Sequence, residues 1–295
     1  MNVWKQEGDV LAPAATGDPD SVRAWEPWAL EEDDGTLRMW YAAHDRTTGR
    51  ILEAVLRPGG RWQRRGVAVD AGLAGESDRY GVGSPCVVRV NEGYLMAYTG
   101  FDGQESRLHL AVSDDGDHWI SRGTVMQGED EDSLEGGTPC LVVGGEQWWL
   151  YYSGHDRSAN GRRSSILAAV SRSGDSWDRV GPVLQPEAGE LAVSHPCVME
   201  ISRKMYMFYA TEHGDQGSIA LATSANGVDW TRRGIVLATP GDDPDSSAVS
   251  SPCIVRLRDG SLRMWYARRP WGDDQLAYSI SAASFSGPGP GNVES

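Results

Sequence analysis

Three side chains in the sequence carry groups suited to proton transfer: Glu26, Glu135 and His195. Each stands near the start of a repeated segment, at a position where the other copies carry different residue types. Two carboxyl groups that face one pocket can divide into a general acid and a general base when their surroundings separate their pKa values, and a histidine can take either role. We therefore predict Glu26 as a base and Glu135 or His195 as an acid.

Glu26 and His195 belong to a set of five residues that stand directly before a proline. A second set of polar residues follows a tyrosine by three or four positions, and we expect both sets to meet at one end of the molecule. There they would bind substrate, together with the aromatic residues beside them. The predicted substrate-binding residues are Trp25, His44, Asp78, Tyr80, Ser84, Thr138, His155, Glu212, Ser251, Arg269 and Trp271.

Structural roles are the alternative for two of these features. Glu26 could pair with Arg23 or Arg269 and simply solvate the end of the molecule. An aspartate also recurs seven residues before the proline in four copies, and such regularity favours a carboxylate that caps backbone N–H groups of a loop. These aspartates are Asp20, Asp78, Asp132 and Asp245.

The prolines mark five copies of one unit of about 57 residues. Pro27, Pro85, Pro139, Pro196 and Pro252 are separated by 58, 54, 57 and 56 positions. Each copy holds an apolar run after the proline, a second run ending in tyrosine, a third alternating run and a fourth run that begins at tryptophan. Repeats built from several short strands predict a radial architecture. We expect an all-β, five-bladed β-propeller with four antiparallel strands per blade, the first strand nearest the axis.

The last copy lacks its tryptophan strand, whereas a spare one begins at Trp4. Pairing this segment with the last blade would close the ring and remove an open sheet edge. We therefore expect residues 1–285 to form one propeller, with 3–12 as the outer strand of blade 5 and 286–295 as a disordered tail. The predicted blades cover residues 22–70, 80–127, 134–185, 192–238 and 248–285.

Composition limits the partners. The formal charge of −15, from 42 acidic and 27 basic residues, argues against nucleic acid or an anionic membrane surface. It favours a neutral or cationic ligand, and the simpler alternative is an acidic surface that only faces solvent. The four cysteines each follow a repeat proline and form neither a metal motif nor a disulfide framework, so we expect free thiols in a reducing compartment. With no leader and no long apolar run, we expect a cytoplasmic monomer that needs no cofactor or metal and acts on a small sugar-like molecule.

Several motifs resemble those of the five-bladed β-propeller glycosidases, the superfamily of glycoside hydrolase families 43, 32 and 130. They are the proline-led inner strands, the Met39-Trp40-Tyr41 type of second strand, and the Ser113 to Trp119 type of turn. The resemblance implies a base directly before the first-blade proline, where Glu26 stands. It implies an acid at the start of the third blade, where Thr138 stands with Glu135 as the nearest acid. A tuning aspartate would belong in the second blade, which has Ser84 in that place and Asp78 upstream.

Three functions are compatible with these features. The first is a glycoside hydrolase-like enzyme that uses acid–base chemistry on a small glycoside or polar cyclic compound. The second is a repurposed propeller, namely a lyase, cyclase or isomerase in which His195 and Glu26 transfer protons without attack by water. The third is a non-catalytic carbohydrate-binding propeller that relies on Trp25 and Arg269.

Overall fold

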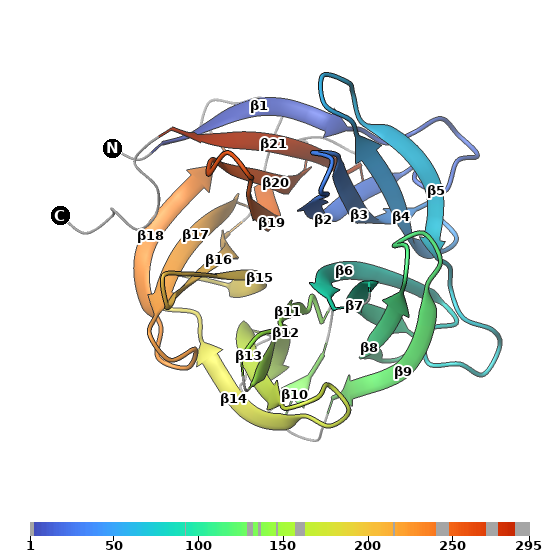
Figure 1. Ribbon diagram of the computed structural model, residues 1–295. Coiled ribbons are helices and arrows are strands. Elements are labelled where there is room, and N and C mark those ends of the chain that lie inside the picture. Colours follow the sequence, from blue (N-terminus) through green and yellow to red (C-terminus); the bar gives the residue numbers. More distant parts are fainter. Residues whose placement is uncertain are drawn as a thin grey trace.

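The computed structural model describes residues 3–91, 93–128, 132–134, 137–145, 147–156, 163–214, 216–239, 248–269 and 277–286. Every regular element in these ranges is a β-strand, and the strands stand in groups around a common centre (Figure 1). No helix in the described part of the chain could cross a membrane. The all-β class expected from the sequence is therefore confirmed.

Each sequence repeat supplies consecutive antiparallel strands that run outward from the centre of Figure 1. Repeat 1 forms β2 (Arg23–Glu31), β3 (Leu37–His44), β4 (Gly49–Leu56) and β5 (Gln63–Val69). Repeat 2 forms β6 (Gly81–Val90), β7 (Gly93–Phe101), β8 (Ser106–Ser113) and β9 (Ile120–Gln127). Repeat 3 forms β11 (Cys140–Val142), β12 (Trp148–Asp156), β13 (Ser164–Ser171) and β14 (Asp178–Leu184), with the short β10 (Asp132–Ser133) also paired to β12. Repeat 4 forms β15 (Ala192–Ile201), β16 (Lys204–His213), β17 (Gln216–Ser224) and β18 (Thr231–Ala238), and repeat 5 forms β19 (Ala248–Arg256), β20 (Leu262–Arg269) and β21 (Ser279–Ser286).

The outermost strand beside repeat 5 comes from the other end of the chain. β1 (Val3–Leu11) pairs antiparallel with β21, and Trp4 lies opposite Phe285. Trp4 is buried and its ring also packs edge-on against Phe208 of repeat 4. The first and last strands of the described chain thus lie side by side (Figure 1).

The turn before each tryptophan strand explains a recurring serine, glycine and tryptophan. In repeat 2 the Ser113 hydroxyl accepts a hydrogen bond from the Gly116 N–H at 2.7 Å, and the Trp119 indole N–H donates to the Gly116 carbonyl at 2.9 Å. Gly116 has a φ of 78°, a conformation that glycine adopts without steric cost. The same bonds recur around Gly174 and Gly227, so these tryptophans fix the turns and pack between repeats.

Buried thiols tie the inner strands to one another near the axis. The Sγ atoms of Cys86, Cys140, Cys197 and Cys253 each accept a backbone N–H from the inner strand of the next repeat, at 3.0 to 3.4 Å. All four cysteines are free, which confirms the expectation drawn from their spacing. Burial raises the pKa of Cys86 and Cys197, and it raises the pKa of Cys253 to about 12.

Repeat 1 departs from this pattern because Trp28 occupies the place of the cysteine. Its indole N–H donates to the Val87 carbonyl of repeat 2 at 2.7 Å, and its ring packs against all five buried hydrophobic clusters. A single large side chain therefore fills the space that four small ones leave at the axis.

Candidate active site

The five residues before the repeat prolines share an unusual backbone conformation. Their φ values are all positive: 51° at Glu26, 48° at Ser84, 36° at Thr138, 52° at His195 and 51° at Ser251. A left-handed conformation costs a non-glycine residue about 1–2 kcal/mol. Strain of this kind persists where the surrounding fold imposes it, and it is frequent at functional sites.

A β-bulge accompanies the strain in four of the repeats. The pairing of each inner strand with its neighbour skips two residues, for example between Trp25 and Trp28 in repeat 1 and between Ser194 and Cys197 in repeat 4. Bulges redirect side chains, and here they turn the pre-proline residues out of the ladder. The ring of pre-proline residues thereby lines one axial cavity.

The axial cavity has a volume of about 280 Å³, including the part open to solvent. Its walls are the five residues Glu26, Ser84, Thr138, His195 and Ser251, their prolines, and Trp28. The sequence grouped these five residues correctly, whereas it gave no role to Trp28. The signal for Trp28 was available, because it is the one large residue in a position that is cysteine in every other repeat.

Glu26 is the best-anchored polar group in this cavity. Its Oε2 atom accepts two hydrogen bonds from Ser84, one from the backbone N–H at 2.9 Å and one from the hydroxyl at 2.8 Å. Its Oε1 atom lies 3.5 Å from Nε2 of His195. The two side chains remain 14% and 26% exposed, so a ligand in the cavity can reach both.

His195 is held from its other side by repeat 3 and by its own strand. The Ser194 hydroxyl lies 2.8 Å from Nδ1 of His195, and the His195 backbone N–H donates to the Ser153 hydroxyl at 3.0 Å. Ser153 also hydrogen-bonds the Thr138 hydroxyl. A carboxylate oxygen only accepts hydrogen bonds. The neutral His195 tautomer that satisfies the contacts with Glu26 and Ser194 therefore carries its proton on Nε2, and Nδ1 accepts from the Ser194 hydroxyl.

The remaining predicted binding residues that the structure describes are not among those that line the axial cavity. The Trp25 ring lies 5.5 Å from the Arg23 guanidinium, and His44 accepts the Arg46 N–H on Nδ1 at 2.9 Å. Burial and the nearby Arg23 lower the pKa of His44. Tyr80 is 59% exposed beneath the Arg79 guanidinium.

Three others mark strand ends around the cavity. His155 is partly buried near the end of β12, Glu212 is exposed near the end of β16, and Arg269 is partly buried as the last residue of β20. Glu135 and Trp271 lie outside the described residues, so both assignments stay predictions.

Asp78 lies away from the axial cavity, beside Tyr98, whose hydroxyl donates to it at 3.3 Å. In repeat 1 the buried Asp20 accepts from the Tyr41 hydroxyl at 2.9 Å and pairs with Arg64 at 2.7 Å. The structural alternative thus fits Asp20, but its side-chain partners are a tyrosine and an arginine where the sequence predicted backbone N–H groups. Asp245 lies outside the described residues, and for Asp132 only the backbone is described.

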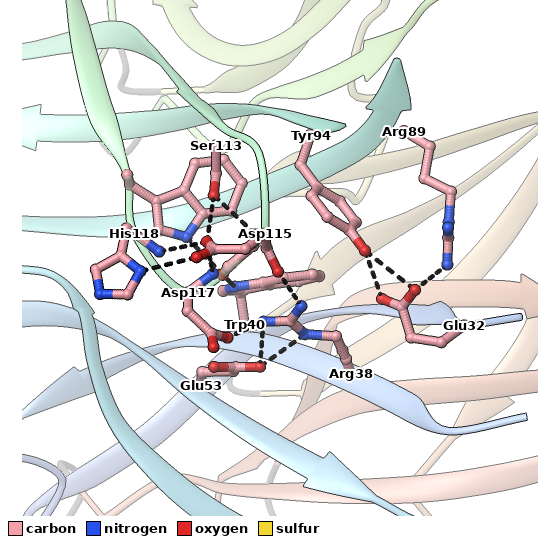
Figure 2. Close-up of polar contacts among 12 residues, drawn as sticks. Glu32, Arg38, Trp40, Glu53, Arg89, Tyr94, Ser113, Asp115, Asp117 and His118 are labelled. Atoms are coloured by element: carbon pink, nitrogen blue, oxygen red, sulfur yellow. Dashed lines mark hydrogen bonds and ion pairs between the residues drawn. The ribbon is translucent and has the colours of Figure 1, made fainter. Parts of the chain in front are cut away.

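A buried carboxyl group that sequence reasoning missed lies in the middle of β4, where repeat 1 faces repeat 2. Glu53 is 5% exposed and hydrogen-bonds Arg38 at 2.7 Å. Figure 2 shows the Arg38 guanidinium between Glu53, Asp117 and the Asp115 carbonyl, all parts of one polar cluster. Burial raises the pKa of Glu53, and Arg38 partly opposes that shift. Because Arg38 bridges two repeats, we assign this cluster to the scaffold.

No group of three or more histidine, cysteine, aspartate or glutamate side chains in the described part of the chain could hold a metal ion. The hydroxyls and the Glu26–His195 pair that line the axial cavity are groups of the kinds that hydrogen-bond polar molecules and transfer protons.

Solved structures of carbohydrate-active enzymes share this fold. A thermostable family-43 glycoside hydrolase superposes with a TM-score of 0.72 at 16% identity, over 89% of this chain and 88% of that one. An alpha-L-arabinofuranosidase from Lactobacillus brevis has a TM-score of 0.72 at 11% identity, over 93% and 95%. A family 117 glycoside hydrolase from Zobellia galactanivorans has a TM-score of 0.72 at 11% identity, over 96% and 90%. At such identities the likeness establishes a propeller-type fold.

Sequence comparison adds the family. No curated protein matches the chain. The profile described as Glycosyl hydrolases family 32 N-terminal domain matches residues 108–255, half of the 295-residue chain. The match begins downstream of Glu26 and Ser84 and includes His195, and it confirms the resemblance to propeller glycosidases. This chain belongs to the glycosyl hydrolases family 32 N-terminal domain family.

Proposed function

We propose that this protein is a glycosidase-like enzyme that binds a small glycoside or another polar cyclic compound in the axial cavity. Glu26 acts as the base and His195 is its partner. The single observation that carries this proposal is the geometry of Glu26: one oxygen accepts two bonds from Ser84, and the other lies 3.5 Å from His195 Nε2. We also propose that the five repeats are the blades of one monomeric ring, closed by the pairing of β1 with β21.

The anchoring of Glu26 suits a general base. The two donors from Ser84 fix the carboxylate, so its second oxygen faces the cavity in a defined orientation, as a preorganised catalytic group requires. In hydrolysis, this oxygen takes a proton from the water that attacks the anomeric carbon. A separate acid gives a proton to the departing sugar oxygen, so one water is consumed for each bond broken.

His195 cannot be that acid on the opposite face of a sugar while it keeps its contact with Glu26. Carboxyl groups that flank a glycosidic bond stand about 6.5–9.5 Å apart in inverting enzymes and about 5–5.5 Å apart in retaining ones. The 3.5 Å contact is shorter than either separation. We therefore assign His195 to orienting Glu26 and relaying its proton, and Glu135 to protonating the leaving group in the hydrolytic reaction.

The same short contact favours a second candidate function. A lyase or isomerase needs one group that removes a proton from carbon and a partner that returns it, and an adjacent Glu26–His195 pair provides both on one side of the ligand. In the isomerase, the base takes a proton from the carbon beside a carbonyl group and the partner returns it to another carbon. In the lyase, the base takes the proton, the partner protonates the departing group, and a double bond forms, so no water is added.

The test is a panel of nitrophenyl glycosides, followed by mass analysis of the products formed in ¹⁸O-labelled water. Glu26→Gln should lower kcat by about 100-fold or more, the usual contribution of a general base, and leave the unfolding temperature unchanged. Asp33→Asn, which changes a side chain that is 92% exposed at the opposite end, is the matched control and should keep full activity.

Label in the product sugar supports hydrolysis, whereas an unsaturated product without label supports the lyase. Full turnover by Glu26→Gln contradicts both enzymatic assignments. Sugar binding without turnover by the unmodified protein would leave the third function, a carbohydrate-binding propeller.

A further inference from the structure

One position on the outermost strands ties neighbouring repeats together. It lies two residues before a strand glycine and is arginine in repeats 1, 3 and 4, as Arg64, Arg179 and Arg232. In each case it pairs with the same alanine of the preceding strand, for example Ala54 with Arg64. The same register places Gln6 in this position on β1 and Ser121 in repeat 2.

The arginines share one set of partners. Arg232 lies 2.9 Å from Glu190, 3.1 Å from the Tyr209 hydroxyl and 2.6 Å from the Gln185 carbonyl. Arg64 pairs with Asp20 and donates to the Ala12 carbonyl, and Arg179 contacts the Tyr152 hydroxyl and the Gln127 carbonyl. Even Gln6 donates to the corresponding carbonyl, that of Ala238, at 3.3 Å. In each of these repeats a side-chain N–H donates to a backbone carbonyl at the end of the outermost strand of the neighbouring repeat. The arginines also contact an acidic side chain, a tyrosine hydroxyl, or both.

Repeat 2 keeps the partners and lacks the donor. Asp78 and Tyr98 stand where Asp20 and Tyr41 stand in repeat 1, and Asp70 follows β5 as Ala12 follows β1. Ser121 is too short to reach across, and its hydroxyl lies 3.4 Å from that of Tyr98. In the described chain no arginine or lysine lies within ion-pair distance of Asp78. A recess of about 1150 Å³, including its solvent-open part, is lined by Asp70, Asp78, Tyr98, Trp119 and Ser121.

A histidine on the wall also distinguishes this recess from the equivalent places in the other repeats. His109, on its wall, is 2% exposed, and its Nε2 atom has no hydrogen-bond partner among the described residues. The corresponding residues are Leu52, Leu167, Ala220 and Ser281, so the histidine is particular to repeat 2. Burial also lowers the pKa of His109, so the ring does not replace the missing cation.

We propose that repeat 2 binds a small guanidinium-bearing molecule in this recess, where it takes the place of the absent arginine. The planar cation donates to the Asp78 carboxylate, the Tyr98 hydroxyl and the Asp70 carbonyl, and its apolar stem lies along Trp119. The recess is separate from the axial cavity, because the two share no lining residue. The inference is therefore independent of the proposed enzymatic function.

Guanidinium fits better than the other cations. A metal ion would need several ligands converging on one point, and no such group is found in the described residues. The chain itself places guanidinium groups in the equivalent sites of three repeats. A guanidinium presents five N–H donors in one plane, which matches an acid, a hydroxyl and a carbonyl arranged around it.

The test is calorimetric titration of the full chain with ethylguanidinium, and with ethylurea as its neutral counterpart of similar shape. We expect ethylguanidinium to bind with a stoichiometry of one and ethylurea to bind at least about tenfold more weakly, because charge-assisted bonds are the stronger ones. Ser121→Arg supplies the cation from within the chain and should abolish the binding. Asp78→Asn should weaken it by about tenfold or more, and it serves alone if Ser121→Arg does not fold.

Equal binding of the charged and neutral probes, no binding of ethylguanidinium, or unchanged binding by a folded variant would each overturn the proposal. A further arm uses N-acetylarginine amide. Tighter binding of this compound than of ethylguanidinium would identify an arginine side chain of a polypeptide as the natural source of the cation, and weaker binding would identify a free small molecule.

Discussion

Trp28 provides the sharpest test of how the axis is built. Two substitutions separate its two contributions: Trp28→Phe keeps most of the packing and removes the indole donor to the Val87 carbonyl, and Trp28→Ala removes both. Leaving that buried carbonyl without its donor should cost about 1–3 kcal/mol. Truncation to alanine, which takes away contacts with all five hydrophobic clusters, should cost about 3–5 kcal/mol.

These free-energy losses convert into differences in unfolding temperature. For a chain of this size, about 1 kcal/mol corresponds to roughly 2 °C in the unfolding temperature. Trp28→Phe should therefore unfold about 2–6 °C below the parent protein, and Trp28→Ala about 6–10 °C below it. Scanning calorimetry measures both, with urea unfolding as the check on the free energies.

The control is Trp177→Phe, which removes an indole donor from a turn at the periphery. The role of Trp28 in filling the axis is refuted if Trp28→Ala unfolds within about 2 °C of the parent protein, because loss of a side chain that contacts every hydrophobic cluster should cost more than that. It is also refuted if the phenylalanine and alanine variants are equally destabilised, because packing would then contribute nothing.

Three further predictions concern other sites. The four axial thiols should resist a thiol-reactive dye in the folded protein and react in urea, because burial raises the pKa of Cys86 and Cys253 and hinders access; prompt reaction without urea would contradict this. Arg38→Gln should destabilise the protein by about 3–5 kcal/mol, and by more at about pH 8 than at about pH 5. Loss of Arg38 raises the folded-state pKa of Glu53 further. Because the unfolded chain then ionises at a lower pH than the folded one, the folded state loses stability as the pH rises toward the folded-state pKa. Equal urea midpoints at the two pH values would exclude this explanation. Ser84→Ala removes one of the two donors to Glu26 and should lower kcat by about tenfold or more with the fold retained, so an unchanged kcat would show that the hydroxyl is not needed.

The strands were largely readable from the sequence, because the repeats align five versions of the same pattern. The prolines located the inner strands, and the tyrosines located the second strands. The spare segment at Trp4 indicated the partner of β21, and the register confirms that pairing. Redundancy is the physical reason: an assignment uncertain in one copy is fixed by the others.

The candidate site was only partly readable. The residues that line the axial cavity were found because they vary within a constant frame, as Glu26 and His195 do. Their direct contact could not be predicted, since it depends on bulges that no residue type specifies. The strand-end residues, such as Glu212, were placed by counting along strands, and counting does not give the direction of a side chain. Glu53 was missed because it stands in a strand that reads as apolar in the other repeats.

The pairing of β1 with β21 has a consequence for how the protein is made. The strand synthesised first can find its partner only after the strand synthesised last has left the ribosome. Until then Trp4 lacks its contact with Phe285, and β20 lacks its neighbour β21. We therefore expect the contact between β1 and β21, which spans nearly the whole described chain, to form late and slowly. A nascent protein that stops short of Ser279 leaves β1 without the strand it pairs with.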